Sequence, residues 1–331
     1  MWEAIGRAEL GDDVFGEDAT VLALEAEAAR VVGKEAALFV TSGTMSNQLA
    51  IAVHTRPGDE VIVGEGAHVV FNESGAGPAL SGVQFAVAGS GGFFTADEME
   101  ERIHPKVYWS PRTSLVCVEN THNRAGGRVF PQETILEIAA RARARGLGLH
   151  LDGARIWNAS VKTGIAVDEL ARPFDTVSVC FSKGLGAPVG SALCASREWI
   201  ERARTLRKRW GGGMRQAGII AAGALFALKN HRARLGEDHE KAQRFAKRIA
   251  ETAGARVDVA GVETNIVNID LEAPLTADAV AEAARPLGLA ISPSGPRRLR
   301  AVMHLDVRAE DVDRAADILA EAIEARRGNG K

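Results

Sequence analysis

The feature that most constrains the fold is the alternation of short, almost wholly apolar runs with segments of helical periodicity. The apolar runs, which we interpret as strands, lie at 37–40, 61–63, 114–118, 149–151 and 177–181. Helices are predicted at 18–32, 44–54 and 131–146, from their apolar spacing and capping residues. Strands that are apolar on both faces and alternate with helices are typical of a mostly parallel sheet covered on both sides. The sequence therefore predicts an α/β domain.

Polar residues follow several of these strands at the points where they end. They are Ser42, His68, Asn120, Asp152 and Lys183. Ligands of such sheets bind at the carboxyl ends of the strands, so we expect these side chains to border one site.

Lys183 follows a predicted strand and precedes a stretch whose glycines and Pro188 do not permit a helix. One interpretation is a solvated turn lysine, as is usual where strands end. The other is a lysine that forms a Schiff base, its amine pKa lowered by burial from about 10.4. Asp152, one crossover earlier, favours the second interpretation. Pyridoxal phosphate needs an amine to hold its aldehyde and an acid to keep its ring nitrogen protonated.

Two further segments have both a structural and a functional interpretation. The amides near Gly43 and the hydroxyl of Thr44, at a predicted helix start, would bind a phosphate, or they belong to an ordinary capped helix. His68 lies in a loop freed by two glycines. It is either a surface residue or a general base, since a pKa near 6.5 suits both.

Six segments, in chain order, resemble the motifs of the L-threonine aldolases, which are fold-type-I pyridoxal phosphate enzymes. The segments are 11–18 (GDDVFGED), 42–48 (SGTMSNQ), 119–123 (ENTHN), 150–155 (HLDGAR), 182–190 (SKGLGAPVG) and 211–216 (GGGMRQ). The resemblance implies retro-aldol cleavage of L-threonine or L-allo-threonine, and of related β-hydroxy-α-amino acids, to glycine and an aldehyde. It also implies a seven-stranded-type sheet in a large domain at 1–234 and a small α+β domain at 235–331.

In that family's pattern, Lys183 would hold the cofactor covalently and Asp152 would face its ring nitrogen. Gly43 and Thr44 would bind its phosphate. His68 would stack on the ring and is the candidate general base.

The resemblance extends to the basic segment 201–209, whose default interpretation is a solvated helix face. It implies that Lys208 reaches a phosphate across a subunit interface and that Arg155 adds to the cofactor site. Arg300, otherwise a solvent arginine on a strand, would bind the substrate carboxylate, with Arg155 assisting.

The chain departs from the family pattern in two places. It starts downstream of a segment with a Ser-Asp-Thr motif that usually contributes to the site, so we expect an N-terminal arm to be missing. Tyr108, Trp109 and Ser110 precede 111–113 (PRT), where relatives often carry a histidine. We expect Trp109 to contact the substrate and to shift the preferred β-substituent toward bulkier or aromatic groups.

Composition narrows the class of protein. The net charge of -3 argues against a nucleic-acid binder, and no apolar segment is long enough to span a bilayer. No signal peptide is evident, and Cys117, Cys180 and Cys194 lie in apolar runs without metal-ligand spacing, which is typical of reduced residues in a cytoplasmic protein. We expect no metal, and the resemblance implies a homotetramer, a dimer of dimers with active sites at the dimer interface. A β-eliminating lyase of the same fold and an inactive cofactor-binding paralogue are the alternatives.

Overall fold

The structure, a computed structural model, describes residues 1–328 of the 331-residue chain. The chain divides into two compact units. The first comprises residues 1–125 and 130–233, and the second comprises residues 126–129 and the chain from Arg234 onward.

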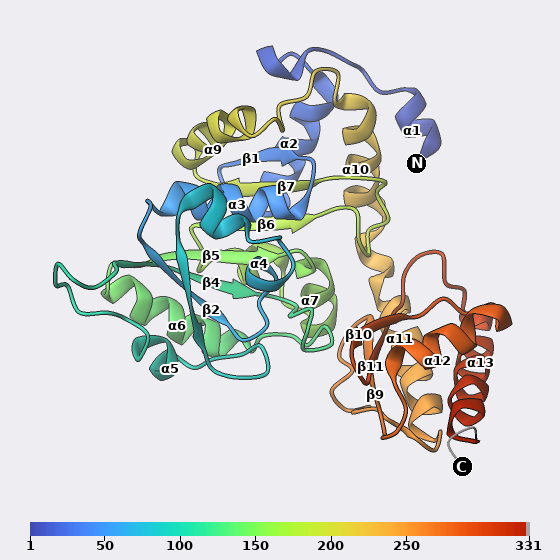
Figure 1. The fold of residues 1–331 in the computed structure, drawn as a ribbon. Helices are drawn as coiled ribbons and strands as arrows, with labels where there is room; N and C mark the ends of the chain where they lie inside the picture. Colours follow the sequence, from blue (N-terminus) through green and yellow to red (C-terminus); the bar gives the residue numbers. More distant parts are fainter. Residues whose placement is uncertain (329–331) are drawn as a thin grey trace. The chain divides into compact units, whose positions relative to one another are not determined.

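The first unit contains a seven-stranded sheet of order β1-β7-β6-β5-β4-β2-β3 (Figure 1). Its strands are β1 (Ala36–Val40), β2 (Glu60–Gly64), β3 (Gln84–Ala88), β4 (Thr113–Glu119), β5 (Gly148–Gly153), β6 (Thr176–Cys180) and β7 (Ser191–Ala195). β7 is antiparallel to both of its neighbours, and the other adjacent pairs are parallel. The predicted mostly parallel sheet is confirmed.

The helices of this unit are α1 (Trp2–Gly6), α2 (Ala19–Val32), α3 (Gly43–His54), α4 (His68–Phe71), α5 (Ala96–Glu100), α6 (Gln132–Ala144), α7 (Ile156–Thr163), α8 (Val167–Ala171), α9 (Arg197–Arg209) and α10 (Gly218–Asn230). The predicted limits of α2 are confirmed, because the Asp18 side chain caps its first turn and Gly33 ends it with a φ of 70°. Leu38 and Val40 of β1 are buried in one cluster with residues of α3 and α9, since alternate strand residues share a face.

The apolar helix α10 begins at Gly218, because the preceding residues form a loop in which the Arg215 carbonyl accepts from the Asp13 amide at 2.8 Å. One expectation about this unit needs correction. His68 does not lie in an open loop but begins the one-turn helix α4.

The second unit contains an antiparallel sheet of order β10-β11-β9-β8. Its elements are α11 (Leu235–Ala250), β8 (Ala255–Arg256), β9 (Ile266–Leu271), α12 (Ala277–Ala284), β10 (Ser292–Gly295), β11 (Arg298–Val302) and α13 (Ala309–Gly328). Phe245, Leu299 and Leu319 lie in its core. The strand β8 is short and pairs with β9 through Ala255 and Arg256.

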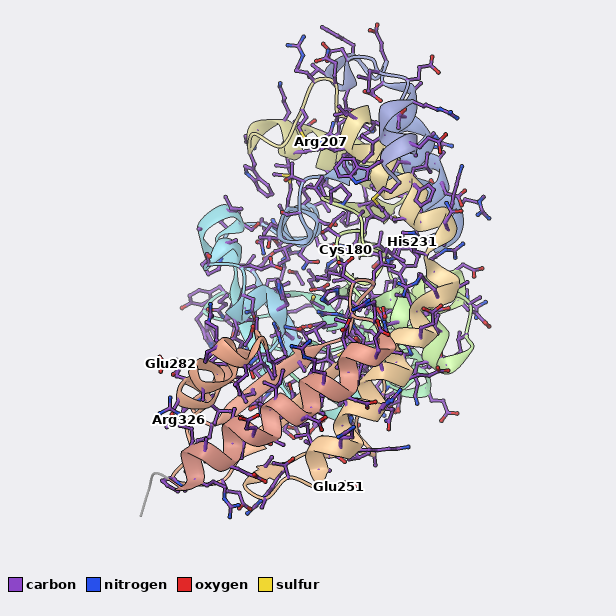
Figure 2. All side chains as sticks on the ribbon, turned by 90° about the vertical axis from the view of Figure 1, so that its right-hand side faces the viewer. Cys180, Arg207, His231, Glu251, Glu282 and Arg326 are labelled. Carbon is purple, nitrogen blue, oxygen red and sulfur yellow. The ribbon has the colours of Figure 1, made fainter. Side chains whose placement is uncertain are left out.

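All three cysteines are buried free thiols, as their apolar surroundings predict. Cys180 ends β6 in the interior of the first unit (Figure 2). Among residues 1–328, no helix combines the length and the apolar character needed to cross a membrane.

Candidate functional site

The parallel strands bring most of the predicted site residues to one edge of the sheet. Asp152 lies at the end of β5, and Lys183 lies three residues beyond the end of β6. Gly43 and Thr44 begin α3 after β1, and His68 begins α4 after β2. All of them therefore lie at the carboxyl edge, where ligands of such sheets bind.

Asp152 is a buried carboxylate with fixed partners, only 3% exposed. Its Oδ2 accepts a hydrogen bond from Asn47 Nδ2 at 2.9 Å, and its Oδ1 accepts one from the Ala154 amide at 3.2 Å. These two hydrogen bonds fix the orientation of the Asp152 carboxylate.

Glu73 is a second buried carboxylate, and its side chain has no exposed surface. Its Oε1 accepts from Asn47 Nδ2 at 2.8 Å and lies 2.8 Å from His68 Nδ1, while its Oε2 accepts from Gln48 Nε2 at 2.6 Å. The hydrogen bond that His68 Nδ1 donates to Glu73 raises the pKa of His68, and burial of the imidazole opposes that effect only in part. Sequence reasoning missed Glu73 because its surroundings, Asn72, Ser74 and Gly75, are typical of a surface turn.

Glu119 fixes the position of His68 from the end of β4. Its Oε2 accepts from the His68 amide at 2.8 Å, and its Oε1 accepts from the Asn123 amide at 2.8 Å. This buried side chain therefore joins the segments that follow β2 and β4. It lies within a motif that the sequence singled out, although no role was predicted for it.

The start of α3 provides donors for an anion. Ser42 Oγ accepts from the Met45 amide at 3.1 Å, and the Ser42 carbonyl accepts from the Ser46 amide. The amides of Gly43 and Thr44 precede the first intrahelical bonds, as at any helix start. A Cβ at Gly43 would lie 3.7 Å from Ser191 Oγ, a buried hydroxyl with no hydrogen-bond partner among residues 1–328.

Arg155 also lies at this edge, since it follows β5, and its Nη1 donates to Asn123 Oδ1 at 3.2 Å. The other predicted residues lie elsewhere. Lys208 is exposed on α9, and Arg300 is on β11 of the second unit, adjacent in the chain to the core residue Leu299. Trp109 is 73% exposed and precedes β4, so it lies at the sheet edge opposite Lys183 of the same chain.

The same basic helix contains a residue that sequence reasoning did not single out. Arg207, labelled in Figure 2, is buried and its Nη2 donates to Asp13 Oδ2 at 2.8 Å. Its Nη1 donates to the carbonyl of Phe39 in β1 at 2.8 Å. This arginine is therefore not part of the predicted solvated face. Its position next to Lys208 in the sequence did not indicate that it is buried.

The donor set fits pyridoxal phosphate. Lys183 supplies a partly exposed primary amine, Asp152 a buried carboxylate, and the start of α3 backbone amides. His68, Glu73 and Asp152 also place possible metal ligand atoms within 4.8 Å of one another. The Asn47 amide already donates to both Glu73 and Asp152. These two carboxylates are therefore arranged to accept hydrogen bonds rather than to bind a metal ion.

Comparison with known proteins gives a consistent result. A family model described as "Beta-eliminating lyase" matches residues 1–272. The chain is 41% identical over 320 residues to a probable low-specificity L-threonine aldolase 2 of Arabidopsis thaliana, with 95% of this chain and 90% of that protein covered. It is 42% identical over 318 residues to the low specificity L-threonine aldolase of Escherichia coli (strain K12), with 96% and 93% covered.

A solved structure supports the fold. The crystal structure of a putative L-allo-threonine aldolase from Listeria monocytogenes EGD-E matches with a TM-score of 0.79 at 21% identity. The match covers 97% of this chain and 92% of that one.

Proposed function

The chain belongs to the low-specificity L-threonine aldolase family, and from that premise we propose that it is a carbon–carbon lyase that cleaves L-threonine and L-allo-threonine. The products are glycine and acetaldehyde, and the cofactor is pyridoxal phosphate. The observation that carries the proposal is the convergence of Lys183, Asp152, His68 and the start of α3 at one sheet edge.

Four groups of this chain hold the cofactor in our proposal. Lys183 binds its aldehyde, Asp152 accepts from its ring nitrogen, and the amides of Gly43 and Thr44 bind its phosphate. When bound, pyridoxal phosphate supplies the electron sink that the cleavage of a Cα–Cβ bond requires. Lys208 and Arg155 supply positive charge to the same site, Lys208 from a neighbouring subunit.

His68 removes the proton of the substrate β-hydroxyl. Its Nδ1 is engaged by Glu73 at 2.8 Å, so Nε2 is the nitrogen that accepts this proton. Glu73 stabilises the imidazolium that forms, since an adjacent carboxylate favours the charged ring.

Arginine side chains hold the substrate carboxylate. Arg300, with Arg155, binds it through paired N–H donors, which a guanidinium presents in a fixed fork. Trp109 precedes β4, at the sheet edge opposite Lys183, so in this proposal it contacts the β-substituent in the site of another subunit.

The expected assembly is a homotetramer built from dimers. Large apolar side chains in the first unit support an assembly, since Trp2 is 84% exposed and Phe15 is 71% exposed. At a subunit interface such side chains would be removed from water, which favours association.

The test is product release from L-threonine and L-allo-threonine with added pyridoxal phosphate. We expect acetaldehyde and glycine in equal amounts. Ammonia and a keto acid would identify the alternative, a β-eliminating lyase, and a yellow protein that releases neither pair would be the inactive paralogue. Lys183→Ala should lose the visible absorbance after dialysis, and a variant that stays yellow would refute the role of Lys183.

A further inference from the structure

Asn47 links the two buried carboxylates of the site. We propose that Asn47 is a positioning residue that holds Asp152 and Glu73 as a fixed pair of acceptors, and that a chain of hydrogen bonds donated in one direction, from His54 through His150, supports its amide in that orientation. This inference rests on the proposed function, in which Asp152 receives the cofactor ring nitrogen.

The orientation of the Asn47 amide follows from its partners. Nδ2 lies 2.8 Å from Glu73 Oε1 and 2.9 Å from Asp152 Oδ2, so the two N–H bonds of the amide meet two carboxylate oxygens. The reverse orientation would place the amide oxygen against both carboxylate oxygens. Each of these contacts would then join two acceptors with no proton between them. Oδ1 therefore points away from the carboxylates, toward His150 Nε2 at 3.2 Å.

The tautomer of His150 follows from that contact. Because Asn47 Oδ1 can only accept, Nε2 of His150 carries the proton. Burial of the ring lowers the pKa of His150 to about 4, so the ring is neutral and Nδ1 carries no proton. Nδ1 therefore accepts from Thr176 Oγ1 at 2.9 Å, and the Thr176 carbonyl, 3.2 Å away, is not its partner.

One more step extends the chain to His54. Thr176 Oγ1 has donated its only proton to His150, so it accepts from His54 Nε2 at 3.0 Å. Burial lowers the pKa of His54 to about 3, which leaves this ring neutral as well. Every bond is then donated in one direction, from His54 to the two carboxylates.

The geometry of strand and helix brings these side chains together. Gly148, His150 and Asp152 alternate on one face of β5, and β6 places Thr176 opposite His150. Asn47 and His54 are seven residues apart on α3 and so share its face. A Cβ at Gly148 would lie 2.5 Å from His54 Nδ1. The absence of a side chain at Gly148 therefore provides the space that the His54 imidazole occupies.

The first experiment measures the tautomers directly, by imidazole ¹⁵N NMR of the full chain at neutral pH before pyridoxal phosphate is added. We expect His150 and His54 to be neutral with the proton on Nε2, with the His150 signals assigned by their loss in His150→Gln. A proton on Nδ1, or a doubly protonated ring, would overturn the inference. This measurement does not depend on the cofactor. Its result therefore tests the inference independently of the proposed function.

The second experiment compares pyridoxal phosphate affinity in His150→Gln and His150→Leu. The amide nitrogen of glutamine occupies the place of Nε2 and can donate to Asn47, whereas leucine cannot donate at all. We expect the leucine variant to bind roughly 5- to 150-fold more weakly, the range that a buried polar group without a partner produces. The glutamine variant should lose less than about fivefold.

Three outcomes are distinguishable in this comparison. Equal losses of pyridoxal phosphate affinity in the two variants, with equal midpoints of urea unfolding, would show that His150 contributes only by packing. That result would overturn the inference. Unchanged affinity in both would do the same. A wild-type protein that does not bind pyridoxal phosphate would refute the proposed function, and the NMR result would then decide the inference by itself.

Discussion

At the scale of single residues, the hydrogen bond to Glu73 is the main cause of the raised pKa of His68. The pair contributes stability that is fully present below the ordinary histidine pKa near 6.5 and is lost as the pH rises through the raised value. A base at this position must be deprotonated before it accepts a proton. The neutral fraction of His68 therefore grows as the pH rises through its raised pKa.

We expect Glu73→Gln to move the acid limb of the kcat/KM profile to lower pH, because the variant removes the main cause of the raised His68 pKa. The measurement is kcat/KM for L-threonine against pH. Glu65→Gln is the matched control, since Glu65 is exposed on the same segment and accepts from the Gly91 amide at 2.7 Å. An acid limb that stays in place in Glu73→Gln would show that another group produces it.

A buried ion pair gives a second prediction at this scale. Asp13→Asn leaves the Arg207 guanidinium buried without its counter-charge, which should lower the free energy of unfolding by about 3–5 kcal/mol. Urea unfolding followed by circular dichroism measures this. Asp12→Asn, which breaks the exposed pair with Arg215, should produce a smaller loss. Equal losses would contradict the importance of burial.

At the scale of elements, Asp18 connects the starts of two helices. Its Oδ1 accepts from the Val21 amide at 3.0 Å and caps α2, while its Oδ2 accepts from the Gly218 amide at 2.9 Å, where α10 begins. A Cβ at Gly218 would lie 2.3 Å from Asp18 Oδ1. The first residue of α10 must therefore be a glycine for the two helix ends to meet.

Asp18→Ala should lower the free energy of unfolding by at least about 2 kcal/mol, because it removes a helix cap and leaves the Gly218 amide without its acceptor. Thr95→Ala is the comparison, since Thr95 caps the short helix α5 at an exposed position. That variant should lose about 1 kcal/mol. Similar losses in urea unfolding would mean that Asp18 acts as a cap alone.

At the scale of the whole molecule, the chain forms two units with separate cores, and the second includes residues from the middle of the chain. Thr264 Oγ1 donates to the Gly127 carbonyl at 2.6 Å, and the Val129 amide donates to Glu263 Oε2 at 2.7 Å. The division into a large domain at 1–234 and a small domain at 235–331 remains a proposal. No single boundary in the sequence separates the two observed units, because residues 126–129 belong to the second.

The proposed tetramer gives a prediction at this scale. Phe15→Asp places a charge on an apolar side chain that is 71% exposed, so it should lower the mass measured by sedimentation equilibrium. Leu136→Asp is the control, because Leu136 lies on α6 and is 47% exposed. A wild-type mass equal to one chain would refute the tetramer, and an unchanged mass in Phe15→Asp would place the interface elsewhere.

The sequence by itself determined the features that depend on neighbours in the chain. The apolar strands, the Asp18 and Gly33 limits of α2, and the buried cysteines follow from local pattern and composition. The positions of Asp152 and Lys183 at strand ends were equally predictable, because a parallel sheet places all such ends on one edge.

Only the tertiary structure decided which side chains surround those residues. Asn47 meets a carboxylate 105 residues away, and His54 meets a hydroxyl 122 residues away. No local pattern records such contacts, since they arise from the packing of α3 against β5 and β6. The same parallel order places Trp109 at the opposite edge from Lys183, because a residue before a strand and a residue after a parallel strand lie at different ends.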